Sequence, residues 1–193
     1  MMKQQPITIS MIYSIAEADF SQLDDQSLVI LDLMHTLIDP SDDEKLIEAL
    51  FADIVAKLQV DKVKIMVLSH HNIADDQAME SCFIMLKNLS IDLSDSFANT
   101  TLALPMFDTL LEKKPVYFKG ILFTNGYPKT EVLNDFLLET QFVPSKIVFV
   151  DDHLEYVESL NRFAIKKEIP FQGYHYTGAD RHKVILVDTK RYF

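Results

Sequence analysis

The sequence predicts an α/β fold built on a doubly wound parallel sheet. Apolar, strand-like segments alternate with helix-like segments along most of the chain. Several of the apolar segments, such as LVILDL at 28–33, show no polar alternation, which is typical of strands buried on both faces. At 193 residues with 48% hydrophobic content, the chain is long enough for one domain, 1–193, with a substantial core.

The first half of the chain supplies three predicted strands and three predicted helices. Ser14 and Glu17 form a capping-box pattern that predicts a short helix ending near Leu23. A second such pattern, SDDE at 41–44, predicts a helix whose apolar stripe runs from Leu46 to Leu58. The strands are expected at 7–13, 28–33 and 63–69, and the third helix at 74–89.

The second half repeats the alternation after a stretch that is hard to interpret. Residues 90–118 are expected to form a small irregular insertion. Strands then follow at 119–126, 145–152 and 169–176, separated by helices at 130–139 and 154–165. The interval from Asp32 to Ser69 is largely filled by one helix, so no large cap domain is expected.

Composition excludes several classes of protein. The net charge of -11 argues against binding to nucleic acid, because phosphate backbones attract Lys and Arg. The single cysteine, Cys82, excludes an internal disulfide. No run approaches the ~18 apolar residues of a membrane span, and the first residues lack a signal-peptide pattern. We therefore expect a cytoplasmic protein, or one exported without an N-terminal signal. The oligomeric state is not predicted.

Polar residues end three of the predicted strands. Asp32, Ser69 and the pair Asp151-Asp152 each follow an apolar run. Ligands of open α/β sheets bind beyond the carboxyl ends of the strands. These residues are therefore expected to converge on one site.

These strand ends, read in order, resemble the motifs of the haloacid dehalogenase superfamily. The first motif, Asp-x-Asp-x-Thr, corresponds to Asp32-Leu33-Met34-His35-Thr36. Ser69 at the end of IMVLS, Lys129 in GYPKTEVLNDFL and the paired acids of IVFVDD match the second, third and fourth motifs. The layout is also similar to a bacterial family of unknown function within that superfamily. The resemblance implies a Rossmann-like core.

The resemblance further implies a phosphohydrolase that needs Mg²⁺. Asp32 would attack phosphorus, as a carboxylate nucleophile does in covalent catalysis. Mg²⁺ would be bound by carboxylate oxygens and one backbone carbonyl, which suits a hard cation. The implied metal ligands are Asp32, Met34 through its carbonyl, Asp151 and Asp152, and the implied phosphate-binding residues are Ser69, Lys129 and Thr36.

Met34 departs from the pattern, since an acid that protonates the leaving group is expected there. General acid–base catalysis contributes roughly 10²–10⁴-fold, so its loss predicts a weak enzyme, or one restricted to aryl phosphates or phosphoproteins. His35 is an alternative proton donor. A second hypothesis is a catalytically inactive protein that binds a phosphorylated partner or serves as an interaction module.

Two further assignments stay open. Thr124 and Lys146 are alternatives to Ser69 and Lys129. We prefer Ser69 and Lys129, because Lys146 lies five residues before Asp151, at the start of the predicted strand. A parallel strand rises about 3.3 Å per residue, so Lys146 is expected near the end of the sheet away from the site. His70, His71 and His175 are candidate residues for the rim of the site.

Overall fold

The computed structural model describes residues 8–39, 41–73, 75–98, 100–104, 107 and 113–179. The strands of the main sheet are β1 Thr8–Ile12, β2 Ser27–Leu31, β5 Lys64–Ser69, β6 Thr101–Ala103, β7 Val116–Phe118, β8 Ile121–Phe123, β9 Lys146–Asp151 and β10 Phe171–Tyr176. A small separate sheet contains β3 Ile38–Asp39 and β4 Asp42–Leu46. The helices are α1 Leu50–Val60, α2 Asp76–Asn88, α3 Lys129–Glu139 and α4 Leu154–Lys166, and a 3₁₀ turn, η1, spans Ile15–Glu17.

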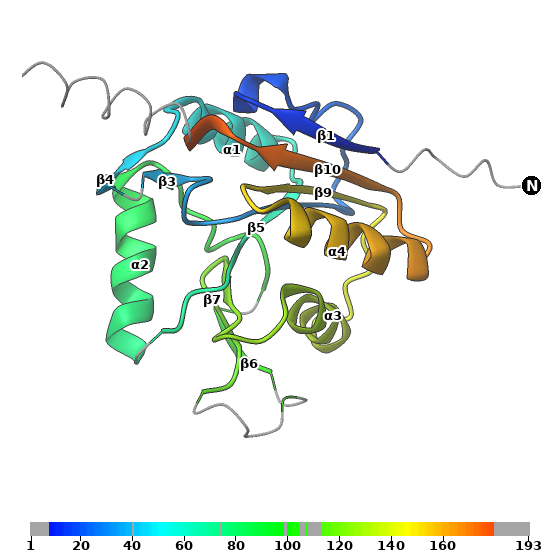
Figure 1. The fold of residues 1–193 in the computed structure, drawn as a ribbon. Helices are drawn as coiled ribbons and strands as arrows, with labels where there is room; N and C mark the ends of the chain where they lie inside the picture. The colour runs from blue at the N-terminus through cyan, green and yellow to red at the C-terminus, as the bar shows by residue number, and fades with distance from the viewer. Residues whose placement is uncertain are drawn as a thin grey trace, which may run out of the picture.

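The main sheet has the strand order β1-β10-β9-β2-β5-β8-β7-β6. Its strands pair in parallel from β1 to β8, and β7 and β6 extend it in antiparallel fashion. Figure 1 shows this sheet with helices packed around it. The predicted α/β fold with a mostly parallel sheet is confirmed, and the described residues contain no large cap domain.

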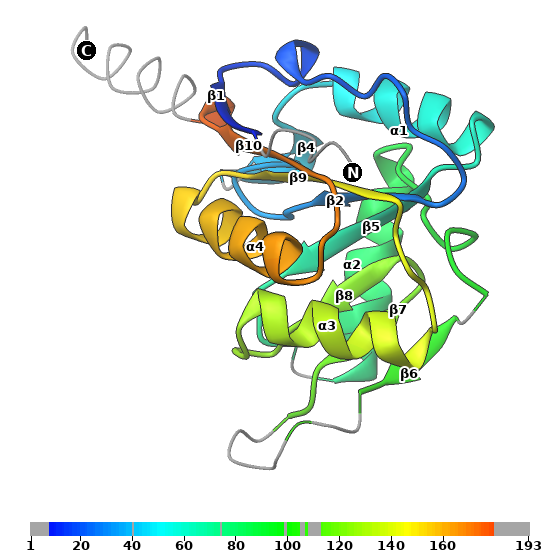
Figure 2. The same cartoon turned by 90° about the vertical axis from the view of Figure 1, so that its right-hand side faces the viewer.

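Alternate residues of the central strand face two different helix layers. Val29 and Leu31 of β2 belong to the core shared with α1 and α2, whereas Leu28 and Ile30 belong to the core shared with α3 and α4. Figure 2 shows the sheet between these layers. Both sets are fully or almost fully buried, which explains why the strand sequence shows no polar alternation.

The helix predicted from residue 41 is wrong over its first turns. Residues 42–46 instead form β4, which pairs with β3, and α1 begins only at Leu50. The backbone of Ile47 donates to the Leu37 carbonyl, so this segment is fastened to the loop after β2. Such tertiary hydrogen bonds override a local capping pattern.

Two other segments differ in extent from the prediction. The capping box of Ser14 and Glu17 is present, but it begins a single 3₁₀ turn rather than a helix reaching Leu23. Within the stretch 90–118, the strands β6 and β7 join the edge of the sheet. Residues 99, 105–106 and 108–112 of that stretch lie outside the described residues. None of the helices in the described part of the chain has the length and apolarity needed to cross a membrane.

Candidate functional site

The carboxyl ends of β2, β5 and β9 lie next to one another because β2 pairs with both of the other strands. Asp32 follows β2 directly, and its backbone N–H donates to the Val150 carbonyl of β9 at 2.9 Å. Ser69 ends β5 and Asp151 ends β9. The structure therefore brings the predicted strand-end residues to one edge of the sheet.

Lys129 bridges two of these carboxylates. Its Nζ lies 2.5 Å from Asp32 Oδ1 and 2.7 Å from Asp151 Oδ2, and its side chain is almost completely buried. The ring of Tyr156 lies below the same ammonium, 4.7 Å from Nζ to the ring centroid. Lys146 lies at the opposite end of β9, where it pairs with Ser27. The placement of Lys129 beside Asp32 agrees with the preferred assignment, and its role stays a prediction.

The charges at this site shift one another's protonation. Burial raises the pKa of Asp151 to about 7, against the opposing effect of Lys129. Burial also raises the pKa of Asp32, and the nearby charge of Asp152 adds to the increase. Burial alone would lower the pKa of Lys129, but Asp32 and Asp151 raise it overall. One ammonium thus faces a surplus of carboxylates, which a bound cation would relieve.

The loop after Asp32 is a tight turn. The backbone N–H groups of Leu37 and Ile38 both donate to the Leu33 carbonyl, and His35 has a positive φ of 63°. Thr36 is fully buried, and its Oγ1 accepts the N–H of Asp152 at 3.2 Å. This hydrogen bond joins the loop after β2 to the loop after β9, so Thr36 has a structural contact here in addition to the predicted phosphate contact.

Met34 lies in that turn with a half-buried side chain that packs against the core formed with α1 and α2. A thioether carries no proton to donate, so the side chain supplies no acid at this position.

The oxygens of Asp151 are engaged within the protein. Oδ2 accepts from Lys129, and Oδ1 accepts the N–H of His153 at 2.8 Å. Asp152 is half-buried, and its Oδ1 lies 3.0 Å from His153 Nδ1. Asp152 and the second oxygen of Asp32 are therefore the better donors for a hard cation, and the contact with His153 holds the Asp152 carboxylate in place. Asp151, His153 and Asp152 also form a group whose ligand atoms lie within 4.8 Å of one another.

Ser69 has its hydroxyl at the same edge. Its Oγ accepts the N–H of His71 at 3.2 Å, which leaves the hydroxyl proton available for another acceptor. Thr124 lies on the next strand end, where its Oγ1 is 3.1 Å from His70 Nδ1. Thr124 therefore lies beside Ser69, and its role as an alternative to Ser69 stays a prediction.

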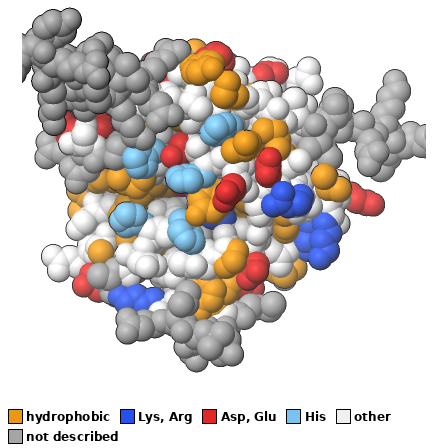
Figure 3. Space-filling model, viewed as in Figure 1, with side chains coloured by type: hydrophobic (Ala, Val, Ile, Leu, Met, Phe, Trp, Pro, Cys, Tyr) orange, Lys and Arg blue, Asp and Glu red, His pale blue; other side chains and the backbone are white. Residues whose placement is uncertain are grey.

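Histidines gather around this edge. Figure 3 shows histidine side chains clustered on one face of the molecule. Those that the structure describes lie in the loops after β2, β5 and β9 or near the end of β10, namely His35, His70, His71, His153 and His175. His175 Nε2 lies 3.0 Å from the Asp152 carbonyl, and His70 packs against Tyr156. Burial, followed by the charge of Lys129, lowers the pKa of His70.

Sequence reasoning did not identify Tyr156 or His153 as part of the site. His153 directly follows the paired acids, and Tyr156 lies in the first turn of the next helix. Their closeness in sequence to the end of a strand is the feature that could have placed both residues at the site.

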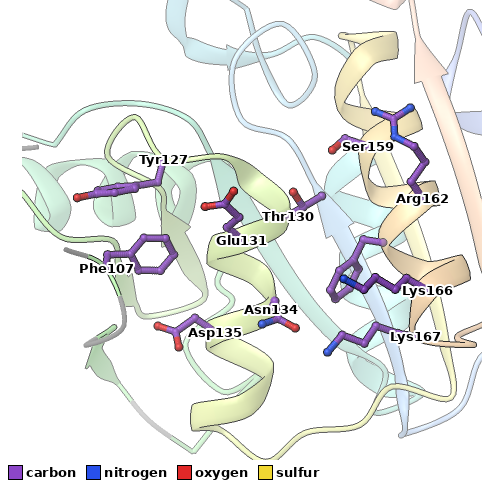
Figure 4. A pocket seen from close by; sticks show the side chains of 11 residues that line it. Phe107, Tyr127, Thr130, Glu131, Asn134, Asp135, Ser159, Arg162, Lys166 and Lys167 are labelled. Atoms are coloured by element: carbon purple, nitrogen blue, oxygen red, sulfur yellow. The ribbon is translucent and has the colours of Figure 1, made fainter. Parts of the chain in front are cut away.

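Two hollows lie near the site. A groove of about 1260 Å³ begins at Leu33 and Met34 and follows α2. Figure 4 shows the second, of about 720 Å³, between α3 and α4. Tyr127 and Glu131 line the second hollow on one side, and Arg162 and Lys166 line it on the other. The strand-end carboxylates Asp32, Asp151 and Asp152 are not among the lining residues of either hollow.

Comparison with known proteins gives one family match. The sequence model of a family described as "Protein of unknown function (DUF2608)" matches residues 42–191. An uncharacterized protein of Rickettsia typhi is 28% identical over 182 residues, which cover 89% of this chain and 61% of that protein. Uncharacterized proteins of Rickettsia felis and Rickettsia conorii are 34% and 31% identical over about half of this chain.

The chain spans between about one third and three fifths of the length of these relatives. No solved structure matches it. The assignment to the haloacid dehalogenase superfamily is wrong, because the matching family is a different one and none of the comparisons indicates that superfamily. Most motifs of that superfamily are short apolar strands that end in a polar residue. Other parallel α/β sheets with polar strand ends produce the same pattern, so the resemblance was not specific.

Proposed function

The chain belongs to the DUF2608 family, and from the chemistry of its strand-end site we propose that it is a metal-dependent phosphohydrolase. The observation that carries the proposal is the arrangement of Asp32, Lys129 and Asp151, with Asp152 beside them. It combines a nucleophile, a fixed positive charge and cation ligands at the edge of a parallel sheet, where ligands bind.

Asp32 is the proposed nucleophile. Its carboxylate attacks phosphorus of a phosphate monoester, the P–O bond to the leaving group breaks, and an aspartyl phosphate forms. Water then attacks the phosphorus of this intermediate, which releases inorganic phosphate and regenerates Asp32. Lys129 offsets the negative charge that develops in both steps. The hydroxyl of Ser69 donates a hydrogen bond to a phosphoryl oxygen.

Mg²⁺ is the proposed cofactor. Asp32, Asp152 and the carbonyl of Met34 would hold it, and it would neutralise phosphoryl oxygens. Asp151 is better suited to fixing Lys129, since both of its oxygens are already engaged.

A second candidate is a protein that binds a phosphorylated partner without turnover. The observation that favours it is Met34, whose thioether has no proton to donate at this position of the turn after Asp32. The phosphate-binding and metal-binding residues are the same in both proposals, so the two differ only in the chemical step.

Hydrolysis of acetyl phosphate, aryl phosphates and alkyl phosphates, with and without Mg²⁺, tests the proposal. The wild type should hydrolyse at least the first two in a Mg²⁺-dependent manner, and Asp32→Asn should be inactive. Lys129→Met should lose activity, whereas Lys146→Met, at the far end of the sheet, should retain it.

Calorimetry with inorganic phosphate and Mg²⁺ separates the two candidates. Binding without turnover supports the partner-binding protein. Neither binding nor turnover, in a folded protein, contradicts both.

A further inference from the structure

The hollow between α3 and α4 has a lining whose chemistry changes along its length. Its volume of about 720 Å³ is within the range of small-molecule sites. Aromatic rings lie at one end, side chains of α3 in the middle and side chains of α4 at the other end (Figure 4). The lining includes none of the strand-end residues Asp32, Ser69, Lys129, Asp151 and Asp152, so the hollow is a separate site.

The aromatic end consists of Phe107 and Tyr127. Their ring centroids lie 4.7 Å apart in an edge-to-face arrangement, and both side chains are half-buried. Tyr127 lies in the turn before α3, so its ring stands beside the first residues of that helix. Half-buried rings on the wall of a hollow are suited to stacking with a planar ring of a ligand.

The opposite end of the hollow is positively charged. Arg162, Lys166 and Lys167 of α4 line it, and all three side chains are exposed. Arg162 lies 3.9 Å from Glu158, and within the described residues no carboxylate lies within 4.0 Å of either lysine ammonium. The chain as a whole has a net charge of -11, so a small anion needs a local group of cations to bind. A guanidinium with two ammonium groups is suited to a phosphate.

The middle of the hollow is formed by polar residues of α3. Glu131 and Asp135 are four residues apart, so they share one face of the helix, and Figure 4 shows both on the side of the aromatic pair. Carboxylates accept hydrogen bonds from hydroxyl groups and repel phosphate. They therefore favour a ligand with hydroxyl groups next to its ring and with its phosphate at the α4 end.

We propose that this hollow binds a nucleoside monophosphate. A nucleotide carries an aromatic base, a ribose with hydroxyl groups and a phosphate in the order in which the hollow presents rings, carboxylates and cations. The base stacks on Phe107 and Tyr127, the ribose hydroxyls donate to the α3 carboxylates, and the phosphate lies beside Arg162 and Lys166. The inference does not depend on the proposed phosphohydrolase function.

Calorimetry with AMP, in EDTA to prevent Mg²⁺-dependent turnover, tests the proposal. The wild type should bind AMP, and Lys166→Glu should lower the affinity at least about tenfold. Lys57→Glu is the matched control, because Lys57 and Lys166 are both exposed in the last turn of a helix and both variants change the net charge equally. The control should keep the wild-type affinity within about twofold. Equal losses for the two variants, or no binding of AMP by the folded wild type, overturn the inference.

The contribution of the base is measured with ribose 5-phosphate, which lacks it. The wild type should bind ribose 5-phosphate at least about tenfold more weakly than AMP, since the stacking contact is lost. Tyr127→Leu keeps an apolar side chain but removes the ring, so it should lower the affinity for AMP at least about fivefold. Equal affinity of the wild type for both ligands means that the hollow takes a phosphate alone and contradicts a nucleotide site.

Ser69→Ala distinguishes this hollow from the strand-end site. The variant removes a proposed phosphate donor there, and it should leave the affinity for AMP within about twofold of the wild type. A loss of AMP affinity in Ser69→Ala without a loss in Lys166→Glu would place the nucleotide at the strand-end site and overturn the inference.

Discussion

Two carboxylates, Asp32 and Asp151, share the ammonium of Lys129 in a nearly dry environment. Burying three ionised groups is costly, and the attraction between them only partly repays the cost. The raised pKa values of both acids are the sign of that imbalance. Perturbed pKa values of this kind are concentrated at functional sites, and this supports the proposed function.

Met34 is the residue at which the chemistry can be altered most simply. Met34→Asp should place a carboxyl group in the turn after Asp32, where it can protonate a leaving group. We expect kcat/KM for alkyl phosphates to rise by up to roughly 10²–10⁴-fold, the usual contribution of a general acid. Aryl phosphates should gain less, because phenolate leaves unaided. Steady-state kinetics on both substrate classes at matched Mg²⁺ measures the difference.

The matched control is Met85→Asp, which adds the same carboxylate to the groove at a position on α2. It should give no gain on alkyl phosphates. Efficient turnover of alkyl phosphates by the wild type would contradict the prediction and point to another proton donor, with His35→Asn as the first variant to test.

At the scale of elements, strands were more predictable than the segment between β2 and α1. The apolar runs at 28–31 and 147–150 are buried on both faces, and few other structures accommodate such runs. The SDDE pattern at 41–44 predicted a helix start, but Ser and Asp side chains also bond to the backbone in other conformations, so the pattern is not specific to helices. The hydrogen bonds that make this segment a strand come from the loop after β2, which local sequence does not reveal.

Glu48, just before α1, connects the start of that helix to η1 and to β10. Its carboxylate accepts from Ser14 Oγ at 2.6 Å, from the N–H of Ile15 at 2.8 Å and from the Tyr176 hydroxyl at 2.8 Å. Hydrogen bonds to a charged group contribute about 1.5–3 kcal/mol each and are not additive. Glu48→Ala should therefore lower the free energy of unfolding by roughly 2–4 kcal/mol, as measured by urea denaturation.

Asp53→Ala provides the control for Glu48. Asp53 is exposed in the first turn of the same helix, where a carboxylate is worth about 0.3–1 kcal/mol through the helix dipole. Similar losses for the two variants would show that Glu48 acts only through the dipole and that its contacts to η1 and β10 add nothing.

At the scale of the whole molecule, the sequence predicts where a site lies but not how its charges pair. Parallel topology alone places Asp32, Ser69 and Asp151 at one edge. The sharing of Lys129 by Asp32 and Asp151, and the position of Asp152 beside His153, depend on side-chain directions set by tertiary packing. The same packing raises the pKa of Asp32 and of Asp151, so the stability of the whole fold is expected to depend on pH.

The free energy of unfolding is expected to fall as pH rises from about 4 to about 7. Asp151 titrates near 3.8 when unfolded and at about 7 when folded, and burial raises the pKa of Asp32 as well. Between these values the folded chain holds protons that the unfolded chain has released, so rising pH favours unfolding. The slope is up to about 1.4 kcal/mol per pH unit for each such proton. The stabilisation is complete below the unfolded pKa and is lost as pH rises through the folded one.

Urea denaturation of the wild type and Asp151→Asn at a series of pH values, without divalent cations, isolates this effect. Asp151→Asn should show a flatter profile, because its side chain does not titrate. His70 acts in the opposite direction near pH 6.5, since burial lowers its pKa and the unfolded chain then holds the extra proton. That contribution is common to both proteins and cancels in their difference. A wild-type profile that rises through this interval relative to Asp151→Asn would mean that Lys129 stabilises ionised Asp151 more than burial penalises it.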